Sequence, residues 1–558
     1  MKRGFSKLIT LLMISALCLT ACTATTNNNN GSKAGDSNIS TNGTSQEPKM
    51  LTYAMSKEPG TLDSSKSQDD LSNEILFHIS EGLVRSYDSK IIPGIAETWD
   101  ISKDGRTYTF HLRESLWSNG DPVTAADFEY SFKRFIDPNT GSAFVETLYG
   151  VVNAEAFNKG EITDSNQVGI KALDEYTLEI TLVEPIPFFL TVLGANSYFY
   201  PVKQDVVEQF GDQYAADETK LITNGPFTLS KWTHESELVM VKNENYWDKD
   251  NIKLDGITQL IIPDGNTAAS MYDSGQLDYL ADIAAALIAK YPDAHSALAG
   301  GVQMLQFNVD GYNEETGKVM SNKNFRKALS YAVDRQGIAN AVAALGTQPA
   351  NRFVLPTTQA ANGLYHDEYT FSGVPSSAQP ELANEYLDSA LAELNMTKEQ
   401  LPKLTYVAME GKQKLYSEAL QDAWSTVLGL KNIEITVLPT PQAIQATMNR
   451  EYDIYVQSLD ASEDASSILD YWVANGSINW TGWNDETYTI MYNTAMAQVD
   501  QEQRFAGLFA AEQYLFDNGP LEPFLYPGVS YIYKDYLTGV IKAAQGSPSQ
   551  LIYADINK

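Results

Sequence analysis

The sequence predicts an α/β protein with two lobes of different character, and three observations support that prediction. Its first part contains short segments of alternating polar and apolar residues, such as the half-buried strand expected over 107–113. A later region, 404–437, reads strand, helix, strand within about 35 residues, the pattern of a crossover unit in a parallel sheet. A folded body of about 510 residues is also long enough for two to four domains.

The chain begins with a targeting segment that does not belong to the folded body. Three basic residues precede an apolar stretch, 8–19, which is shorter than the roughly 20 residues that span a bilayer. Small residues precede Cys22, and the quartet 19–22 resembles the bacterial lipobox. That resemblance implies a lipoprotein signal peptide over 1–21 and a diacylated Cys22. The alternative is an ordinary secretory signal with an incidental cysteine.

A polar tether, 22–48, follows and is rich in Asn, Ser, Thr and Gly. Such a composition buries too little apolar surface to order itself, and a flexible coil of this length spans roughly 25–30 Å. Each buried methylene of an acyl chain contributes about 0.8 kcal/mol to membrane binding. Two acyl chains therefore keep a protein on the membrane, whereas a protein with one chain binds reversibly. We therefore expect a body anchored to the extracytoplasmic face of the cell membrane. The polar tether and the lack of cysteines favour a Gram-positive surface.

Charge and cysteine content narrow the function classes. Without the three basic residues of the signal segment, 36 basic against 71 acidic side chains remain, a net charge of −35. This balance argues against nucleic-acid binding, which needs clustered Lys and Arg. The two cysteines, Cys18 and Cys22, both lie in the first 22 residues. The folded body therefore has neither a disulfide nor a cysteine nucleophile. A body of this size can bury a large hydrophobic core and does not need disulfides for stability.

Hydrophobic periodicity places the main elements. Thr124 is expected to cap a helix, with Asp127 three residues on in a capping-box position. The phenylalanines of 128–135 recur at helical spacing and predict one apolar stripe. Further strands are expected over 178–182, 404–409 and 433–437, and further helices over 325–333, 387–394 and 415–428.

Catalytic and metal-binding motifs are absent from the sequence. None of the histidines has zinc-type spacing, and there is no Gly-x-Ser-x-Gly elbow or Walker-type loop. Acidic pairs abound, but 71 acids guarantee pairs by chance. We therefore expect no enzyme, no metal and no cofactor, and a surface hydrolase or adhesin is the remote alternative. The histidines are His78, His111, His234, His295 and His366.

A series of short motifs runs through the chain in a fixed order. They are 58–63 (EPGTLD), 81–84 (EGLV), 96–99 (AETW), 104–113 (DGRTYTFHLR), 117–128 (WSNGDPVTAADF), 224–227 (NGPF), 245–247 (NYW) and 324–335 (NFRKALSYAVDR). Together they resemble the peptide-binding class of bacterial extracellular solute-binding proteins that serve ABC importers. Each motif also has a structural role in turns or packing, so the series identifies the fold and does not mark the site.

The resemblance implies a periplasmic-binding-protein-like fold of two α/β lobes that close over a ligand. Its first lobe is discontinuous and carries an extra small domain. Hinge closure of this kind lets one ligand bridge both lobes. We expect the first lobe over 49–79, 201–308 and 521–558, the extra domain over 80–200 and the second lobe over 309–520.

The resemblance also places a ligand between two extended segments. One is 67–70, soon after the Thr-Leu-Asp motif, and the other is 458–460, after the Tyr-Asp pair at 452–453. A peptide can pair with such segments as an added strand, through backbone groups that are the same in every sequence. The candidate peptide-binding residues are Gln68, Asp69, Asp70, Phe144, Arg450, Ser458, Leu459, Asp460 and Asp464.

Three of these assignments leave alternatives open. The family usually has a Trp before its ammonium-binding acid and a Pro after it, and 459–465 has neither. Asp460 is the expected acid, with Asp464 and Glu463 as rivals; all three could equally be solvated loop acids. Phe144 matches a cleft aromatic but could pack in a core. The planar guanidinium of Arg450 could bind a peptide carboxylate, or Arg450 could be an ordinary surface residue.

The expected function is that of a monomeric, lipid-anchored substrate-binding subunit of an ABC importer. It would capture oligopeptides mainly through their backbone and deliver them to the permease subunits. The alternative is a non-peptide solute on the same fold, such as an oligosaccharide or a metal chelate. Sparse histidines argue against a metal, whereas Trp480 and Trp483 leave sugar stacking open.

Overall fold

A computed structural model describes residues 47–558 except 343–344, 462–463, 477 and 545–546. The expected signal peptide, Cys22 and nearly all of the tether therefore lie outside the described residues. Within the described part, no helix combines the length and apolar character that a membrane crossing requires.

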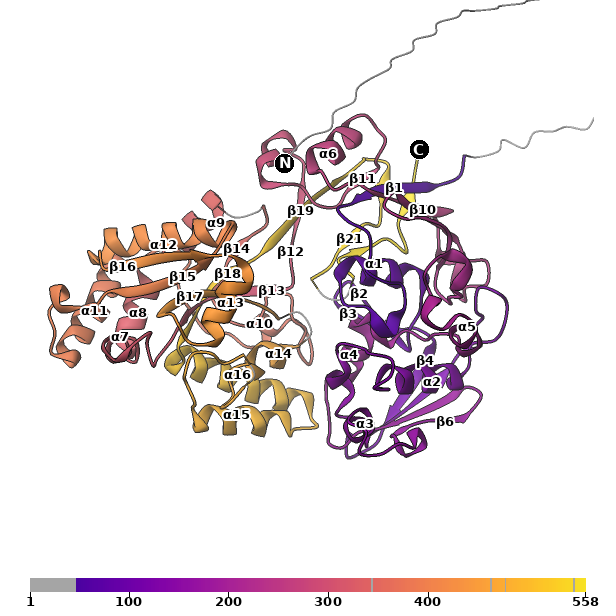
Figure 1. Cartoon of the computed structure of the whole chain (residues 1–558), viewed down its shortest axis with the longest axis horizontal. Helices are drawn as coiled ribbons and strands as arrows, with labels where there is room; N and C mark the ends of the chain where they lie inside the picture. The colour runs from indigo at the N-terminus through magenta and orange to yellow at the C-terminus, as the bar shows by residue number, and fades with distance from the viewer. Residues whose placement is uncertain (1–46, 343–344, 462–463, 477, 545–546) are drawn as a thin grey trace, which may run out of the picture. The chain divides into compact units, whose positions relative to one another are not determined.

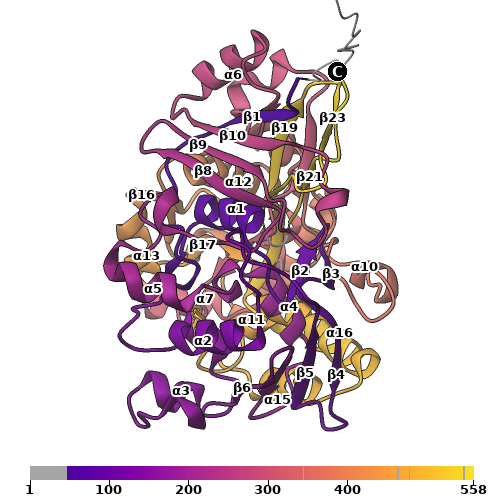
Figure 2. The ribbon, with the colours of Figure 1, turned by 90° about the vertical axis from the view of Figure 1, so that its right-hand side faces the viewer.

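One sheet has seven strands in the order β12-β19-β11-β1-β10-β9-β8 (Figures 1 and 2). Its strand β1 pairs in parallel with β10, and the buried side chains of β1 alternate as a strand with one core-facing side requires. Its strands are β1 (Met50–Met55), β8 (Phe227–Thr233), β9 (Glu237–Lys242), β10 (Gly256–Ile261), β11 (Tyr279–Leu280), β12 (His295–Leu298) and β19 (Gly528–Tyr533). Nearby helices are α1 (Asp70–Ile79), α5 (Gln204–Phe210) and α6 (Gly265–Asp273).

A second sheet has six strands in the order β14-β18-β13-β17-β15-β16. The expected crossover unit is confirmed, because β15 and β16 pair in parallel and α12 connects them. The strands are β13 (Gly301–Phe307), β14 (Gln348–Pro349), β15 (Leu404–Met409), β16 (Ile433–Leu438), β17 (Ile454–Asp460) and β18 (Leu521–Tyr526). The helices are α7 (Glu314–Met320), α8 (Lys323–Tyr331), α9 (Arg335–Val342), α10 (Tyr365–Glu368), α11 (Pro380–Leu394), α12 (Lys412–Leu428), α13 (Thr440–Met448), α14 (Ala465–Asp470), α15 (Glu486–Met496) and α16 (Gln501–Asn518).

A third sheet, β4-β5-β7-β6, lies within the segment expected to form the extra domain. The capping box of Thr124 and Asp127 is confirmed at the start of α2, and the phenylalanine stripe of this helix is buried. The strands and helices are β2 (Val84–Tyr87), β3 (Lys90–Pro93), β4 (Ala96–Ile101), β5 (Thr107–Leu112), β6 (Ile170–Asp174), β7 (Thr177–Thr181), α2 (Ala125–Phe135), α3 (Ala154–Asn158) and α4 (Phe189–Ala195).

The chain crosses twice between the seven-stranded and six-stranded sheets. β12 belongs to the first sheet and β13 to the second, so one crossing lies at 299–300. β18 belongs to the second sheet and β19 to the first, so the other crossing lies at Pro527. A division by sheet membership therefore runs through these two points.

Several of the ordered sequence motifs contact one another in the fold. The side-chain amide of Asn224 accepts from the backbone N–H of Glu81 at 2.9 Å and donates to its carbonyl at 2.9 Å. The Glu81 carboxylate binds Arg85 through two bonds of 2.9 Å and accepts from the Tyr246 hydroxyl at 2.5 Å. All four side chains are buried. The motifs therefore stabilise the fold, as expected.

The tryptophans of these motifs have packing roles. Trp117 is fully buried in the core beneath the four-stranded sheet. The guanidinium of Arg113, at the end of β5, lies 3.6 Å from the ring centroid of Trp247. Trp99 packs, partly buried, against the same core as Trp117. None of the three lines the cavity that the described residues form beside β1.

Candidate functional site

A cavity of about 690 Å³ lies beside the first strand, β1, and receives residues from both large sheets. It brings 68–70 together with Asp460, the two segments that were expected to face each other across a ligand. These segments are far apart in the chain, so only folding makes them neighbours. The remaining lining comes from 53–57, 71, 73–74, 195–196, 281–282, 298–299, 529, 542–544 and 548.

The first wall is extended backbone that turns into helix α1. Ser67 and Asp69 have extended backbone angles, and Asp70 is the first residue of the helix. The Asp69 carboxylate caps α1 by accepting from Ser72, at 3.1 Å from the backbone N–H and 2.6 Å from the hydroxyl. It also accepts from the backbone of Gly60 at 3.1 Å. Asp69 therefore holds the wall in place, while Gln68 and Asp70 are exposed.

The second wall is the end of β17. This strand pairs with β13 along its whole length, from Phe307↔Ile454 to Gly301↔Asp460. On its other side, β17 pairs with β15 at one position among the described residues, Tyr406↔Ile454. Because Ala461 donates to Gly300, antiparallel alternation turns the backbone groups of Ser458 away from β13. Ser458 is also exposed.

The two rival acids near the end of β17 differ in their surroundings. Asp460 is exposed and lines the cavity. Asp464 is buried, caps α14 and binds Arg504 through bonds of 2.8 and 2.9 Å. Burial alone would raise the pKa of Asp464, but the Arg504 charge and hydrogen bonds bring that pKa below its usual value. Its charge is therefore already compensated. The third rival, Glu463, lies outside the described residues.

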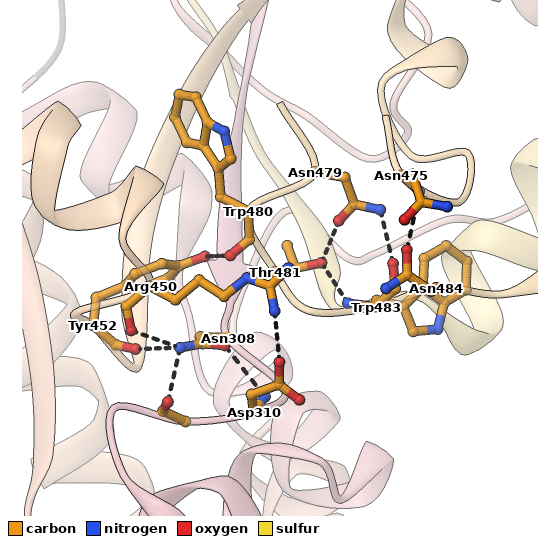
Figure 3. A network of polar contacts seen from close by, with 11 residues as sticks. Asn308, Asp310, Arg450, Tyr452, Asn475, Asn479, Trp480, Thr481, Trp483 and Asn484 are labelled. Atoms are coloured by element: carbon orange, nitrogen blue, oxygen red, sulfur yellow. Dashed lines mark hydrogen bonds and ion pairs between the residues drawn. The ribbon is translucent and has the colours of Figure 1, made fainter. Parts of the chain in front are cut away.

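Arg450 and Phe144 lie away from the described cavity lining. Arg450 pairs with Asp310 at 2.8 Å, and its own carbonyl accepts from the Asn308 side chain at 3.1 Å (Figure 3). Its side chain is 42% exposed, so this pair contributes little stability. Phe144 stacks on Tyr198 with ring centroids 5.7 Å apart and keeps 39% of its surface exposed. The geometry gives neither residue a contact with the cavity.

Trp480 and Trp483, the two tryptophans considered for sugar stacking, lie near the polar contacts of Arg450 and Asp310 (Figure 3). The carbonyl of Trp480 accepts from the Tyr452 hydroxyl at 3.1 Å, and Figure 3 shows its ring pointing away from the ion pair. Trp483 packs against Tyr488 with ring centroids 5.5 Å apart. Neither lines the cavity beside β1. The position of these rings therefore gives no support to a sugar-stacking platform there.

Acidic side chains predominate in the cavity lining. Burial raises the pKa of Glu74 above its usual value, whereas the charge of Lys542 opposes that shift. Glu74 accepts from the Tyr53 hydroxyl, which in turn accepts from Gln259. An excess of acids in a confined space favours cationic groups. The charged lining residues are Asp69, Asp70, Glu74, Asp282, Asp460, Lys57 and Lys542.

Several lining residues belong to no motif or pattern that the sequence analysis identified. Tyr53, Glu74 and Lys542 come from a strand, a helix and the C-terminal segment, and none belongs to a motif of ligand-binding type. Their common feature is tertiary position. Among the described residues no cluster of His, Cys, Asp and Glu could hold a metal ion.

Fold and cavity together define a class, the two-lobed α/β proteins that bind a solute between their lobes. The family model described as bacterial extracellular solute-binding proteins, family 5 Middle, matches residues 90–480. The chain therefore belongs to the bacterial extracellular solute-binding proteins of family 5.

Named relatives agree with this assignment. The chain is 31% identical to the dipeptide-binding protein DppE of Bacillus subtilis (strain 168), over 95% of each chain. It is 30% identical to the oligopeptide-binding protein OppA of the same organism, over 98% of each chain. The unliganded, open form of the periplasmic murein tripeptide-binding protein MppA matches with a TM-score of 0.79 and 26% identity. That match covers 92% of this chain and 98% of the other.

Proposed function

We propose that this protein captures oligopeptides in the cavity beside β1 and delivers them to the permease subunits of an ABC importer. The ligand would be held chiefly through its backbone. One observation carries the proposal: the cavity is lined at once by Gln68, by Asp70 and by Asp460, at the end of a strand with an open edge. An extended peptide fits such an edge because its own N–H and C=O groups complete the ladder.

The chemistry of the lining supports a peptide with a free N-terminus. Asp460 is the exposed acid at the end of β17, and an ammonium group that leaves water needs a carboxylate partner. Asp464 is a weaker candidate, since Arg504 already neutralises it. We therefore assign the ammonium contact to Asp460. Backbone contacts to the ligand are assigned to Gln68 and Ser458, whereas Phe144 and Arg450 would need a rearrangement to reach it.

The proposal includes an anchor on Cys22 and a membrane location. A diacylated cysteine followed by a polar tether would keep the binding body near its permease and let it move. Radioactive palmitate labelling of cells tests this part: the wild-type protein should carry label in the membrane fraction. The Cys22→Ala variant should lose the label and leave the membrane. Equal labelling of both proteins would contradict the anchor.

The ligand class is tested by identifying what the protein carries when it is purified. The mature chain is isolated under native conditions, denatured, and the released small molecules are identified by mass spectrometry. Peptides without one fixed sequence are expected. Calorimetric titration with a peptide pool should then give saturable binding. Recovery of a bile acid, sugar or metal chelate, together with no response to any peptide pool, would contradict the proposal.

A further inference from the structure

The open edge of β17 does not extend along the whole strand. Antiparallel alternation turns the backbone groups of Ile454, Val456 and Ser458 to the side away from β13. β15 pairs with this side at Ile454. A ligand strand can therefore pair with β17 only beyond Ile454. How far that pairing extends depends on whether the backbone of Val456 is free to take part in it.

A side chain covers Val456. The amide nitrogen of Gln413, in the first turn of α12, donates to the Val456 carbonyl at 3.0 Å. It stands where the backbone N–H of a neighbouring strand would stand. The other atom of this amide, Oε1, is buried and has no hydrogen-bond partner among the described residues. Ser458, two residues further along, is exposed.

We propose that Gln413 is an end stop that fixes the register and limits the length of a peptide paired with β17. The inference rests on the proposed function and concerns the same site. A peptide strand can pair with Ser458, but a residue that continues towards Val456 meets the Gln413 amide instead of a free carbonyl. Peptide residues beyond this point add no backbone hydrogen bond, so affinity stops rising with length.

The test measures how affinity depends on peptide length. Calorimetric titrations of the mature protein use alanine-rich peptides from about two to eight residues. With the wild type, affinity should rise with length and then stay constant. The Gln413→Ala variant exposes the Val456 carbonyl, so peptides past the wild-type plateau should bind about fivefold more tightly, the effect of one added hydrogen bond. Short peptides should bind both proteins equally.

The same helix offers a matched control. Gln421 also lies on α12, and its amide also donates to a strand carbonyl, that of Ile433 at 2.8 Å. Ile433 belongs to β16, away from the edge of β17. The Gln421→Ala variant should therefore keep the wild-type length profile. Gln413→Ser, whose short hydroxyl suits the first turn of a helix, repeats the test if the alanine variant has a lowered Tm.

The outcomes separate this inference from the proposed function. If the wild type binds no peptide of any length, the proposed function fails. If the wild type binds peptides but both Gln413 variants keep its plateau, the end stop is overturned while the function stands. A gain for long peptides in the Gln421 variant as large as in the Gln413 variants would likewise overturn the end stop.

Discussion

Asn224 and Glu81 are joined by two hydrogen bonds of 2.9 Å between the side-chain amide of the first and the backbone of the second. They belong to two different sequence motifs, 143 residues apart. Both residues are buried, so each lost bond leaves a buried backbone group without a partner. This pair explains why the motifs identify the fold and do not mark the ligand site.

The first prediction concerns the two hydrogen bonds between Asn224 and Glu81. Asn224→Ala should lower the free energy of unfolding by about 2–4 kcal/mol, because two buried backbone groups lose their partner. Urea denaturation followed by tryptophan fluorescence measures the loss. Peptide preference should be unchanged in the folded fraction. A variant of normal stability with altered peptide preference would contradict the structural role.

The second prediction concerns the neighbouring glycine. A Cβ on Gly225 would lie 2.3 Å from backbone atoms of Ile79 and Ser80, which cannot move aside as a flexible side chain would. Gly225→Ala should therefore destabilise the protein by about 3 kcal/mol or more. Gly265, whose Cβ position is open, supplies the matched control. Thermal unfolding should show a large loss of Tm for the first variant and little change for the second.

The third prediction concerns a buried histidine. His78 contacts the Glu74 carbonyl through Nδ1 at 2.7 Å and accepts from the Leu551 N–H through Nε2 at 3.1 Å, so both ring nitrogens are engaged in the neutral form. Burial lowers the pKa of His78 from 6.5 to about 4. The unfolded chain therefore binds this proton first, and stability should fall as the pH falls from about 6.5 towards 4.

The size of that effect follows from the shift, about 3 kcal/mol over the whole window. Urea denaturation at a series of pH values measures it. His78→Gln should be less stable at pH 7 and should flatten the dependence in this window. Substitution of an exposed histidine, His111, serves as the control and should leave the wild-type slope. An unchanged slope in the His78 variant would contradict the prediction.

The fourth prediction separates the two acids at the end of β17. Asp460→Asn should weaken binding of peptides with a free N-terminus by roughly 10–100-fold, because a charged hydrogen bond is lost. Binding of N-acetylated peptides should change much less. Calorimetry with paired free and acetylated peptides gives the comparison. Equal losses for both peptide forms would show that Asp460 does not bind the ammonium group.

The fifth prediction concerns Asp464. Asp464→Asn leaves the buried guanidinium of Arg504 without a charge partner and should lower the free energy of unfolding by about 3–5 kcal/mol at pH 7. The folded pKa of Asp464 is depressed below 3.8, so its contribution is present above that value and lost as the pH falls further. Stability of the variant should therefore depend less on pH in this acidic range. A loss of ammonium selectivity without loss of stability would contradict this assignment.

The sequence alone determined those features that depend on residues close together in the chain. The alternation of Tyr108, Phe110 and Leu112 is a local pattern, and all three are buried in one face of β5. The capping box of Thr124 and Asp127 spans three residues and is present as expected. Such patterns predict elements because helix and strand geometry repeat every few residues. The order of the motifs then identified the family and its fold.

Tertiary structure alone decided which residues share the cavity and which charges are already paired. Asp464 is paired because Arg504 lies on a later helix, α16, that packs against α14. Asp460, four residues earlier in the sequence, lines the cavity. Gln413 reaches Val456 only because α12 begins beside the open edge of β17. Contacts between distant segments depend on how whole elements pack, and no local periodicity records that packing.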